Sequence, residues 1–306
     1  MLCAAVGTLV IASTATATAP KLPSAGTASQ IARLVAASVN IKTLSPTVLN
    51  KVGNAFNDNA AVDYPKTKNG CPALRTCDFG DTKSSKKIVI MGDSHAQMWI
   101  PALNRIGNAL KLKVIVLYMA QCPAASLDVW LSIYNKSYTA CSQQRTAWIA
   151  TLNKIHPLTV LLTDHTNGVH SAASSGTQPF TSAEWQAGLQ TTIAELKPSK
   201  AKLAVIGDPV TFDTEPPICL ANNQSEVQKC DALTPNPDRP GQQVAERAAA
   251  NAAKVLYVDP TKWLCTATTC SPVVGNYIVF YDSFHISCTY AAFLSGVLQA
   301  SLKKVL

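Results

Sequence analysis

The sequence predicts an α/β fold, a three-layer sandwich in which helices cover both faces of a five-stranded, mostly parallel sheet. Five short runs rich in Val, Ile and Leu have the composition of strands that are buried on both faces. Helical patterns separate these runs, as expected for parallel strands joined by crossover helices. The five predicted strands are residues 86–91, 113–119, 158–163, 202–208 and 254–259.

The helices are predicted from apolar residues that recur every three or four positions. Thr181, followed by Glu184, forms a capping box that indicates where one of these helices begins. Three long loops follow strand ends, on the edge where open parallel sheets usually bind their ligands. The predicted helices cover residues 99–110, 185–196, 244–253 and 289–304, and the loops are residues 120–137, 164–180 and 209–241.

The composition excludes several classes of protein. Of the 306 residues, 47% are apolar and 14% are charged, against a typical charged share of about 25%. Such a chain folds rather than staying disordered. The 26 basic residues give a net charge of +8 but never form a block longer than a pair. Nucleic-acid-binding proteins usually cluster such charge, so we expect no nucleic-acid partner and only a mild preference for anionic surroundings.

The beginning of the chain suggests export from the cytoplasm. Residues 1–20 contain a short apolar run and small-residue cleavage candidates, but no Lys or Arg precedes Lys21. This segment is either a weak export signal or the end of a transmembrane helix, and the missing basic residues favour the second interpretation. We expect residues 21–69 to form an Ala/Ser-rich linker with short helices, and residues 70–306 to form the domain.

The cysteines indicate an oxidising compartment. There are ten, and none forms a Cys-x-x-Cys pair. Eight fall into neighbouring couples within loop-like sequence, a pattern that suits local disulfides better than a zinc site. Disulfides imply a location outside the cytoplasm. The couples are Cys71 with Cys77, Cys122 with Cys141, Cys219 with Cys230 and Cys265 with Cys270; Cys3 and Cys288 are left over, and Cys288 is expected to be buried on a helix.

The first predicted strand ends in Gly92-Asp93-Ser94-His95. Ser94 is therefore expected at a strand-to-helix turn on the carboxyl edge of the sheet. A serine in that position is presented to solvent beside the N–H groups that open the next helix. The alternative is a turn in which Asp93 and Ser94 only cap the helix.

A second motif, Tyr-Asp-Ser-Phe-His-Ile-Ser, covers residues 281–287 near the C-terminus. Asp282 and His285 stand three positions apart at the entry to a helix. In this arrangement the carboxylate reaches the imidazole Nδ1–H and leaves Nε2 free to take a proton from a serine. Such a pair is common by chance, and Asp282 alone would also suit a helix cap. Together with Ser94, however, the pair predicts a catalytic triad.

These two motifs resemble the first and last blocks of the SGNH hydrolase superfamily, also called GDSL-type esterases. More narrowly, they resemble the SGNH domain fused behind bacterial membrane acyltransferases of family 3, together with the steps at residues 121–123 and 207–210. The resemblance implies a flavodoxin-like SGNH fold with Ser94 as nucleophile and His285 as general base and then acid. Asp282 is implied as the carboxylate that orients His285.

The family pattern also implies an oxyanion hole, built from the Ser94 backbone N–H, a Gly N–H and an Asn side chain. No Gly lies between Gly107 and Gly168, so the second block is not identifiable here. Asn167 is the candidate for the Asn role, with a simple Asn-Gly turn as the alternative. Because one lost donor costs about 100- to 1,000-fold in rate, this departure affects rate and substrate class more than reaction type.

Two further residues are candidates for substrate binding. His165 lies in a loop over the expected site, and Trp130 lies in a loop between Cys122 and Cys141. A solvated loop and core packing, respectively, are the alternatives. A metal site from His95, His165 and His285 would lack a carboxylate at a suitable spacing, so we predict no metal and no other cofactor.

We therefore expect an extracytoplasmic serine esterase or O-acyltransferase domain that works through an acyl-Ser94 intermediate. The resemblance points to a short acyl group, acetyl above all, moved on or off a cell-envelope polysaccharide. The expected partners are an acylated glycan and a membrane acyltransferase domain upstream, and we expect a monomer. The alternative is an inactive glycan-binding domain of the same fold. The missing second-block Gly favours that alternative, and the intact Ser, His and Asp set disfavours it.

Overall fold

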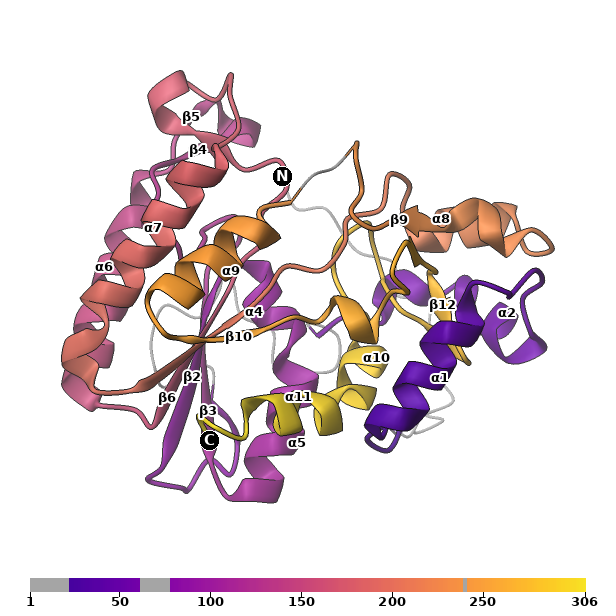
Figure 1. Ribbon diagram of the computed structural model, residues 1–306, viewed down its shortest axis with the longest axis horizontal. Helices are drawn as coiled ribbons and strands as arrows, with labels where there is room; N and C mark the ends of the chain where they lie inside the picture. Colours follow the sequence, from indigo (N-terminus) through magenta and orange to yellow (C-terminus); the bar gives the residue numbers. More distant parts are fainter. Residues whose placement is uncertain (1–21, 61–77, 239–240) are drawn as a thin grey trace, which may run out of the picture.

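Within residues 22–60, 78–238 and 241–306, which the computed structural model describes, a six-stranded sheet forms the centre of the molecule (Figure 1). The strand order is β1-β3-β2-β6-β8-β10; the last five are parallel, and β1 is antiparallel at the edge. The predicted α/β sandwich and its five strands are confirmed, and β1 is an addition. The strands are β1 (Asp78–Gly80), β2 (Lys87–Gly92), β3 (Lys113–Tyr118), β6 (Thr159–Thr163), β8 (Lys202–Ile206) and β10 (Leu256–Val258).

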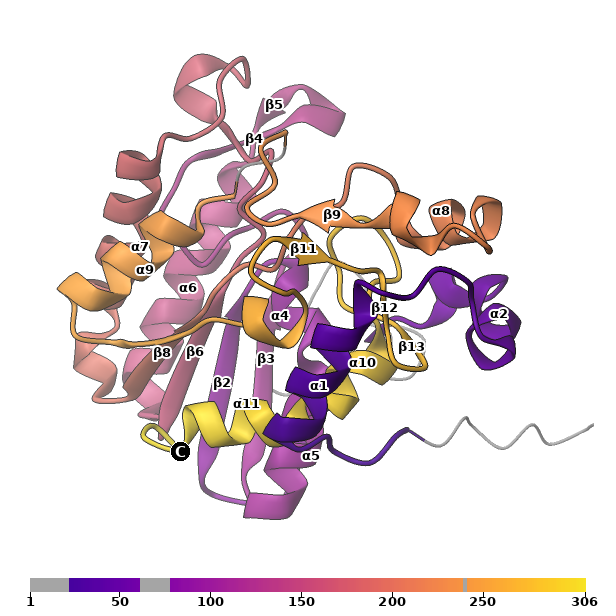
Figure 2. The ribbon, with the colours of Figure 1, turned by 45° about the vertical axis from the view of Figure 1, so that its right-hand side comes forward.

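Helices cover both faces of the sheet (Figures 1 and 2). Successive side chains of β2 point into opposite layers, because side chains alternate along a strand. Ile88 and Ile90 belong to one buried cluster, whereas Val89 and Met91 belong to the other. On the first face lie α1 (Ala28–Ser38), α5 (Ile100–Leu110), α10 (Cys288–Phe293) and α11 (Ser295–Leu302), and on the second lie α6 (Thr139–Ile155), α7 (Ser182–Glu195) and α9 (Gln243–Ala252).

Short elements complete the fold. The described residues also form the short α-helices α2 (Pro46–Val52) and α8 (Pro216–Asn222). A third short helix, α4 (Ser94–Met98), follows β2 directly. Three small sheets lie outside the central one, of which the three-stranded sheet β5-β4-β7 is the largest. Their strands are β4 (Val129–Leu131), β5 (Lys136–Ser137), β7 (His170–Ser171), β9 (Ala232–Leu233), β11 (Thr269–Cys270), β12 (Val273–Val274) and β13 (Tyr277–Ile278).

Local chemistry explains where the helices begin. The Thr181 hydroxyl accepts from the Glu184 N–H while the Glu184 carboxylate accepts from the Thr181 N–H, which is the predicted capping box of α7. Pro101 lies in the first turn of α5, where its missing N–H costs no hydrogen bond. The helical stretch between β2 and β3 is therefore divided into two helices, α4 and α5, with Trp99 at the junction.

The described part of the stretch expected as a linker lies against the domain. The Gly26 N–H donates to the Phe293 carbonyl at 2.8 Å. Ile31 and Val35 of α1 are buried in the same cluster as Ile88 and the α5 side chains. Helix α1 thus contributes to the hydrophobic core, and α2 adds Val48 to a smaller cluster around α8. No described helix is both long enough and apolar enough to cross a bilayer.

Three of the predicted disulfides are confirmed: Cys122–Cys141, Cys219–Cys230 and Cys265–Cys270. Cys71, Cys77 and Cys3 lie outside the described residues, and Cys288 is buried on α10 as expected.

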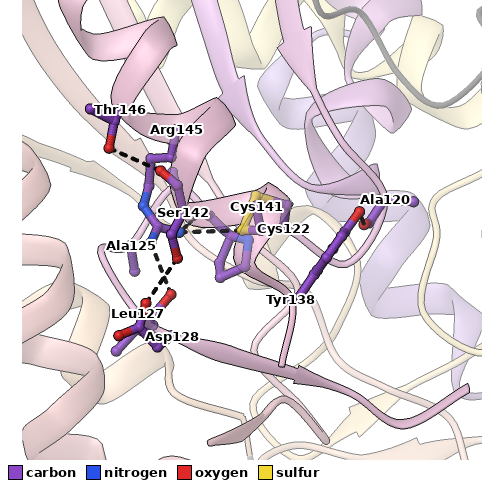
Figure 3. Close-up of a disulfide and its surroundings, with 12 residues drawn as sticks. Ala120, Cys122, Ala125, Leu127, Asp128, Tyr138, Cys141, Ser142, Arg145 and Thr146 are labelled. Atoms are coloured by element: carbon purple, nitrogen blue, oxygen red, sulfur yellow. Dashed lines mark hydrogen bonds between the residues drawn. A yellow bond between two sulfur atoms is a disulfide. The ribbon is translucent and has the colours of Figure 1, made fainter. Parts of the chain in front are cut away.

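The Cys122–Cys141 disulfide joins the loop after β3 to the first turn of α6 (Figure 3). Arg145, one turn further along α6, donates to the carbonyls of Pro123 at 3.1 Å and Leu127 at 2.8 Å. A covalent bond and two charge-assisted hydrogen bonds therefore hold the same loop on α6.

Removing this disulfide should destabilise the domain. The bond closes a loop of 19 residues, so the double variant Cys122→Ser/Cys141→Ser should lose about 3 kcal/mol in the free energy of unfolding. The matched variant Cys265→Ser/Cys270→Ser opens a loop of only 5 residues and should lose about 2 kcal/mol. Urea unfolding followed by circular dichroism measures both losses. A midpoint equal to that of the unmodified chain would contradict the role given to the longer loop.

Candidate active site

Ser94 lies where β2, a central strand, meets α4 at the carboxyl edge of the sheet. The Asp93 side chain is buried and holds this turn. Its Oδ1 accepts from the His95 N–H at 2.9 Å, and its Oδ2 accepts from the His165 N–H at 2.8 Å. One carboxylate therefore fixes both the turn that presents Ser94 and the loop that follows β6. A glycine is required at position 92, directly before Asp93, because a Cβ there would lie 1.8 Å from the Thr163 carbonyl oxygen.

His285 and Asp282 lie in a closed loop before α10. An antiparallel bridge between Phe280 and Ile286 closes the loop. Asp282 Oδ1 accepts from the N–H groups of Phe284 at 3.0 Å and His285 at 2.8 Å, so this carboxylate shapes the turn as well as facing the imidazole.

The segment after β8 anchors this loop from outside. The Phe212 N–H donates to the Ser283 carbonyl at 2.7 Å. Inside the loop, the Tyr281 ring stacks on His285 with 5.3 Å between ring centroids and an interplanar angle of 3°. These contacts hold the imidazole in one orientation.

The structure brings Ser94, His285 and Asp282 into one hydrogen-bonded chain. Asp282 Oδ2 lies 2.7 Å from His285 Nδ1, and His285 Nε2 lies 2.7 Å from Ser94 Oγ. In this arrangement the carboxylate accepts from Nδ1–H, and Nε2 is the atom that faces the serine hydroxyl. The geometry is that of a serine activated by a neighbouring imidazole.

The charges around the triad suit this role. Burial lowers the pKa of His285, and His95 and His165 lower it further, against the opposing attraction of Asp282. Burial would raise the pKa of Asp282, but His285 and two backbone N–H groups outweigh it and bring that pKa below its usual range. At neutral pH the site therefore holds a neutral imidazole beside an ionised carboxylate, which is the state that a general base requires.

A second cluster lies beside the triad and includes a residue to which the sequence assigned no role. Asp208, directly after β8, has its Oδ1 2.9 Å from His95 Nδ1 and its Oδ2 3.7 Å from His165 Nδ1. Asp208 Oδ2 also accepts from the Thr166 N–H at 2.7 Å and the Thr166 hydroxyl at 2.8 Å. Burial opposes ionisation of Asp208, but the two histidines outweigh it and lower its pKa well below the usual range.

Among the described residues, His95, His165 and Asp208 form the group with the side-chain atoms a metal ion would need; these atoms lie within 4.8 Å of one another. Ligand atoms bound tetrahedrally to zinc at about 2.0–2.1 Å are separated by about 3.3 Å. The 2.9 Å between His95 Nδ1 and Asp208 Oδ1 is shorter than this and is the distance of a direct contact between the two side chains. Thr166 already occupies Asp208 Oδ2. We therefore interpret the cluster as a carboxylate shared by two histidines.

The other predicted site residues have different surroundings. Asn167 is half-buried in a turn with Gly168, whose φ is +68°. Trp130 belongs to β4 and packs on the backbone of Gly176, and none of its described contacts is with the triad. The His165 ring stacks on Phe284, the residue before His285.

The loop after β3 contains a residue in a conformation that favours glycine. Gln121 has a φ of +59°, in the left-handed region that few other residues adopt without strain. This loop also borders a groove of about 530 Å³, lined by Met119, Gln121, Tyr134 and Tyr138 among others. The Met119 N–H donates to the Gly92 carbonyl at 3.3 Å, so the groove begins beside the turn that carries Ser94.

The serine, imidazole and carboxylate at the carboxyl edge of this parallel sheet are arranged as these groups are in serine hydrolases. A family model described as the SGNH domain fused to AT3 domains matches residues 61–300, so the chain belongs to this family of SGNH domains. No protein with a curated description matches the chain.

Solved structures are similar to this chain at low sequence identity. The periplasmic domain of a lipopolysaccharide acetyltransferase from Salmonella ser. Paratyphi A is 18% identical, with a TM-score of 0.53, over 72% of this chain and 83% of that chain. A GDSL-like lipase from Bacteroides thetaiotaomicron is 15% identical, with a TM-score of 0.40, over 72% of this chain and 89% of that chain.

Activity should decline on the acid side only below the ordinary pKa of a histidine. Hydrolysis of a chromogenic acetyl ester requires neutral His285, and the pKa of His285 lies below its ordinary value of 6.5, so kcat/KM should decline only below that pH. In Asp282→Asn this acid limb should move to still lower pH, because Asp282 raises the pKa of His285. The rate in Asp282→Asn should fall by about 10,000-fold, because the carboxylate that holds His285 in its Nδ1–H tautomer is lost. A limb that moves upward in Asp282→Asn would contradict this assignment.

Proposed function

We propose that this chain is an extracytoplasmic serine esterase or O-acyltransferase domain that moves a short acyl group, acetyl above all, on or off a cell-envelope polysaccharide. The observation that supports it most directly is the chain of two 2.7 Å contacts from Asp282 through His285 to Ser94. Membership of the SGNH family adds the reaction class, acyl transfer or ester hydrolysis.

The mechanism follows from the geometry. Ser94 Oγ attacks the ester carbonyl while His285 Nε2 takes the hydroxyl proton, and Asp282 stabilises the resulting imidazolium. The ester C–O bond then breaks as His285 returns the proton to the leaving alcohol, which leaves an acyl group on Ser94. In the second half, water or a sugar hydroxyl attacks the acyl carbon while His285 Nε2 takes its proton. The bond between the acyl carbon and Ser94 Oγ then breaks, and His285 returns the proton to Ser94 Oγ. The acceptor decides between esterase and transferase.

Three features support the location and the substrate class. The disulfides require an oxidising compartment to form and persist. The family is described as fused to AT3 domains, which supports a membrane acyltransferase as partner. The groove beside Gly92 contains Tyr134 and Tyr138, and aromatic rings with a polar tip suit an extended polar ligand. Trp130 of β4 is also proposed as a sugar contact, although it is not among the residues that line this groove.

Replacing the nucleophile should abolish turnover. Ser94→Ala should lower hydrolysis of a chromogenic acetyl ester by at least about 1,000-fold, because no acyl-enzyme can form. Ser283→Ala, which also removes a hydroxyl but in the turn beside His285, is the matched control and should keep most of the activity. Undiminished turnover in Ser94→Ala would remove Ser94 from the mechanism.

The second candidate function is a glycan-binding domain without catalytic activity. The observation that favours it is the absence of a glycine at Gln121 and throughout the loop after β3. A fluorophosphonate probe separates the two functions, because it labels only an activated serine. We expect labelling of the full chain that is lost in Ser94→Ala; an unlabelled chain that still binds polysaccharide would support the second candidate instead.

The acceptor is tested by adding polysaccharide to the same reaction. With an acetyl ester as donor, a transferase should place acetyl on the glycan, seen as new O-acetyl signals by NMR, whereas an esterase should release only acetate. The reverse experiment, with an O-acetylated glycan and no donor, should release acetate from the glycan in the esterase case. If neither glycan is changed by a chain that hydrolyses the small ester, the polysaccharide is not its substrate.

A further inference from the structure

His165 is a histidine beside the triad that the triad itself does not use. Its backbone N–H donates to Asp93, the residue before Ser94, at 2.8 Å. Its ring stacks on Phe284, the residue before His285, with 4.3 Å between centroids and an interplanar angle of 20°. The backbone of His165 is therefore tied to the nucleophile turn, and its ring is tied to the loop that carries the base.

The charges around His165 favour its protonated form. Burial alone would lower its pKa, but Asp208, then Asp93 and Asp282, raise it above the usual value. The groups that face it are Asp208 after β8, Asp93 and His95 at the start of α4, and Asp282 and His285 before α10. The carboxylates outnumber the other imidazoles, so a positive charge at His165 is compensated within the site.

The His165 side chain is partly exposed. Nδ1 faces Asp208 across 3.7 Å, and Nε2 lies on a different edge of the ring. The His165 side chain is 17% exposed, whereas those of His95 and Asp208 are 0% and 1% exposed. His165 is thus the member of the cluster that reaches solvent, and it contacts both the Ser94 turn, through Asp93, and the His285 loop, through Phe284.

The proposed attack by Ser94 needs a hydrogen-bond donor beside the nucleophile. Attack by Ser94 creates a negative oxygen that must be met by donors at about 2.7–3.1 Å. The loop after β3 contains no glycine, and Asn167 stands in a turn with Gly168. A cationic ring held by its neighbours before the substrate arrives would stabilise that charge without reorganisation.

We propose that His165 is a catalytic residue, whose Nε2–H is the side-chain donor of the oxyanion hole in the role that the family pattern gives to an asparagine. This inference rests on the proposed acyl-Ser94 mechanism. It makes Asp208 a positioning residue, because Asp208 contacts His165 and His95.

The test compares His165→Ala and His165→Gln in the full chain with an acetyl ester as substrate. His165→Ala should lower kcat by about 100- to 1,000-fold with KM changed by less than about threefold, since the donor acts on the transition state. His165→Gln, which supplies a neutral N–H donor, should recover part of this loss. His156→Ala is the matched control: His156 lies at the opposite end of β6, is exposed, and should keep kcat.

The pH profile adds a readout that a structural role would not move. His165 lowers the pKa of His285, so the acid limb of kcat/KM should shift to higher pH in His165→Gln. An unchanged melting temperature of His165→Gln would show that this variant is folded. If His165→Ala does not fold, the test rests on His165→Gln, which should show both a lowered kcat and an acid limb of kcat/KM shifted to higher pH.

Three outcomes would overturn the inference. The first is a His165→Ala variant with kcat within about threefold of the unmodified chain. The second is a loss of 100- to 1,000-fold in Asn167→Ala but not in His165→Ala, which would assign the donor to Asn167. The third is one equivalent of bound metal that is lost in His165→Ala, which would make His165 a ligand. In all three outcomes the fluorophosphonate probe still labels Ser94 of the unmodified chain, and the chain still hydrolyses the acetyl ester. If the unmodified chain does neither, the proposed function itself is contradicted.

Discussion

The hydrogen bond between Ser94 Oγ and His285 Nε2, 2.7 Å long, joins residues 191 positions apart in the chain. It forms only because β2 ends at the centre of the sheet and the loop before α10 returns to the same edge. Asp93 holds one side of this contact through two backbone N–H groups. Asp282 holds the other through two backbone N–H groups and the His285 imidazole. The two carboxylates therefore fix the backbone around Ser94 and His285 and so align these two side chains. A reaction sensitive to small displacements requires this alignment.

Much of the sheet was predictable, because strands buried on both faces must be continuous apolar runs. Helix α6 was not predicted, since its buried face includes Cys141 and Arg145 beside Trp148, Ile149 and Leu152, and an apolar pattern cannot reveal a buried arginine or half-cystine. Strand β1 has three residues, too few to show any alternation. Both were missed because tertiary contacts, rather than local composition, determine them.

The triad was predictable from short motifs, because Asp282 and His285 meet through local backbone geometry and Ser94 occupies a strand end. The cluster beside it was not. The sequence suggested His95 and His165 as neighbours but offered no carboxylate, because Asp208 lies more than 40 residues further along the chain and reaches them only through the order of β2, β6 and β8 in the sheet. Long-range pairing of this kind leaves no periodic pattern in a single sequence.

The packing of α1 has a mechanical consequence. Gly26 is hydrogen-bonded to Phe293, and Ile31 and Val35 are buried under the same layer as α5 and α11. The chain enters the domain at a fixed point on that layer rather than through a free tether. Residues 26–35 are thereby fixed relative to the sheet, so a force or a rotation applied at Gly26 would be transmitted to the sheet and its carboxyl edge.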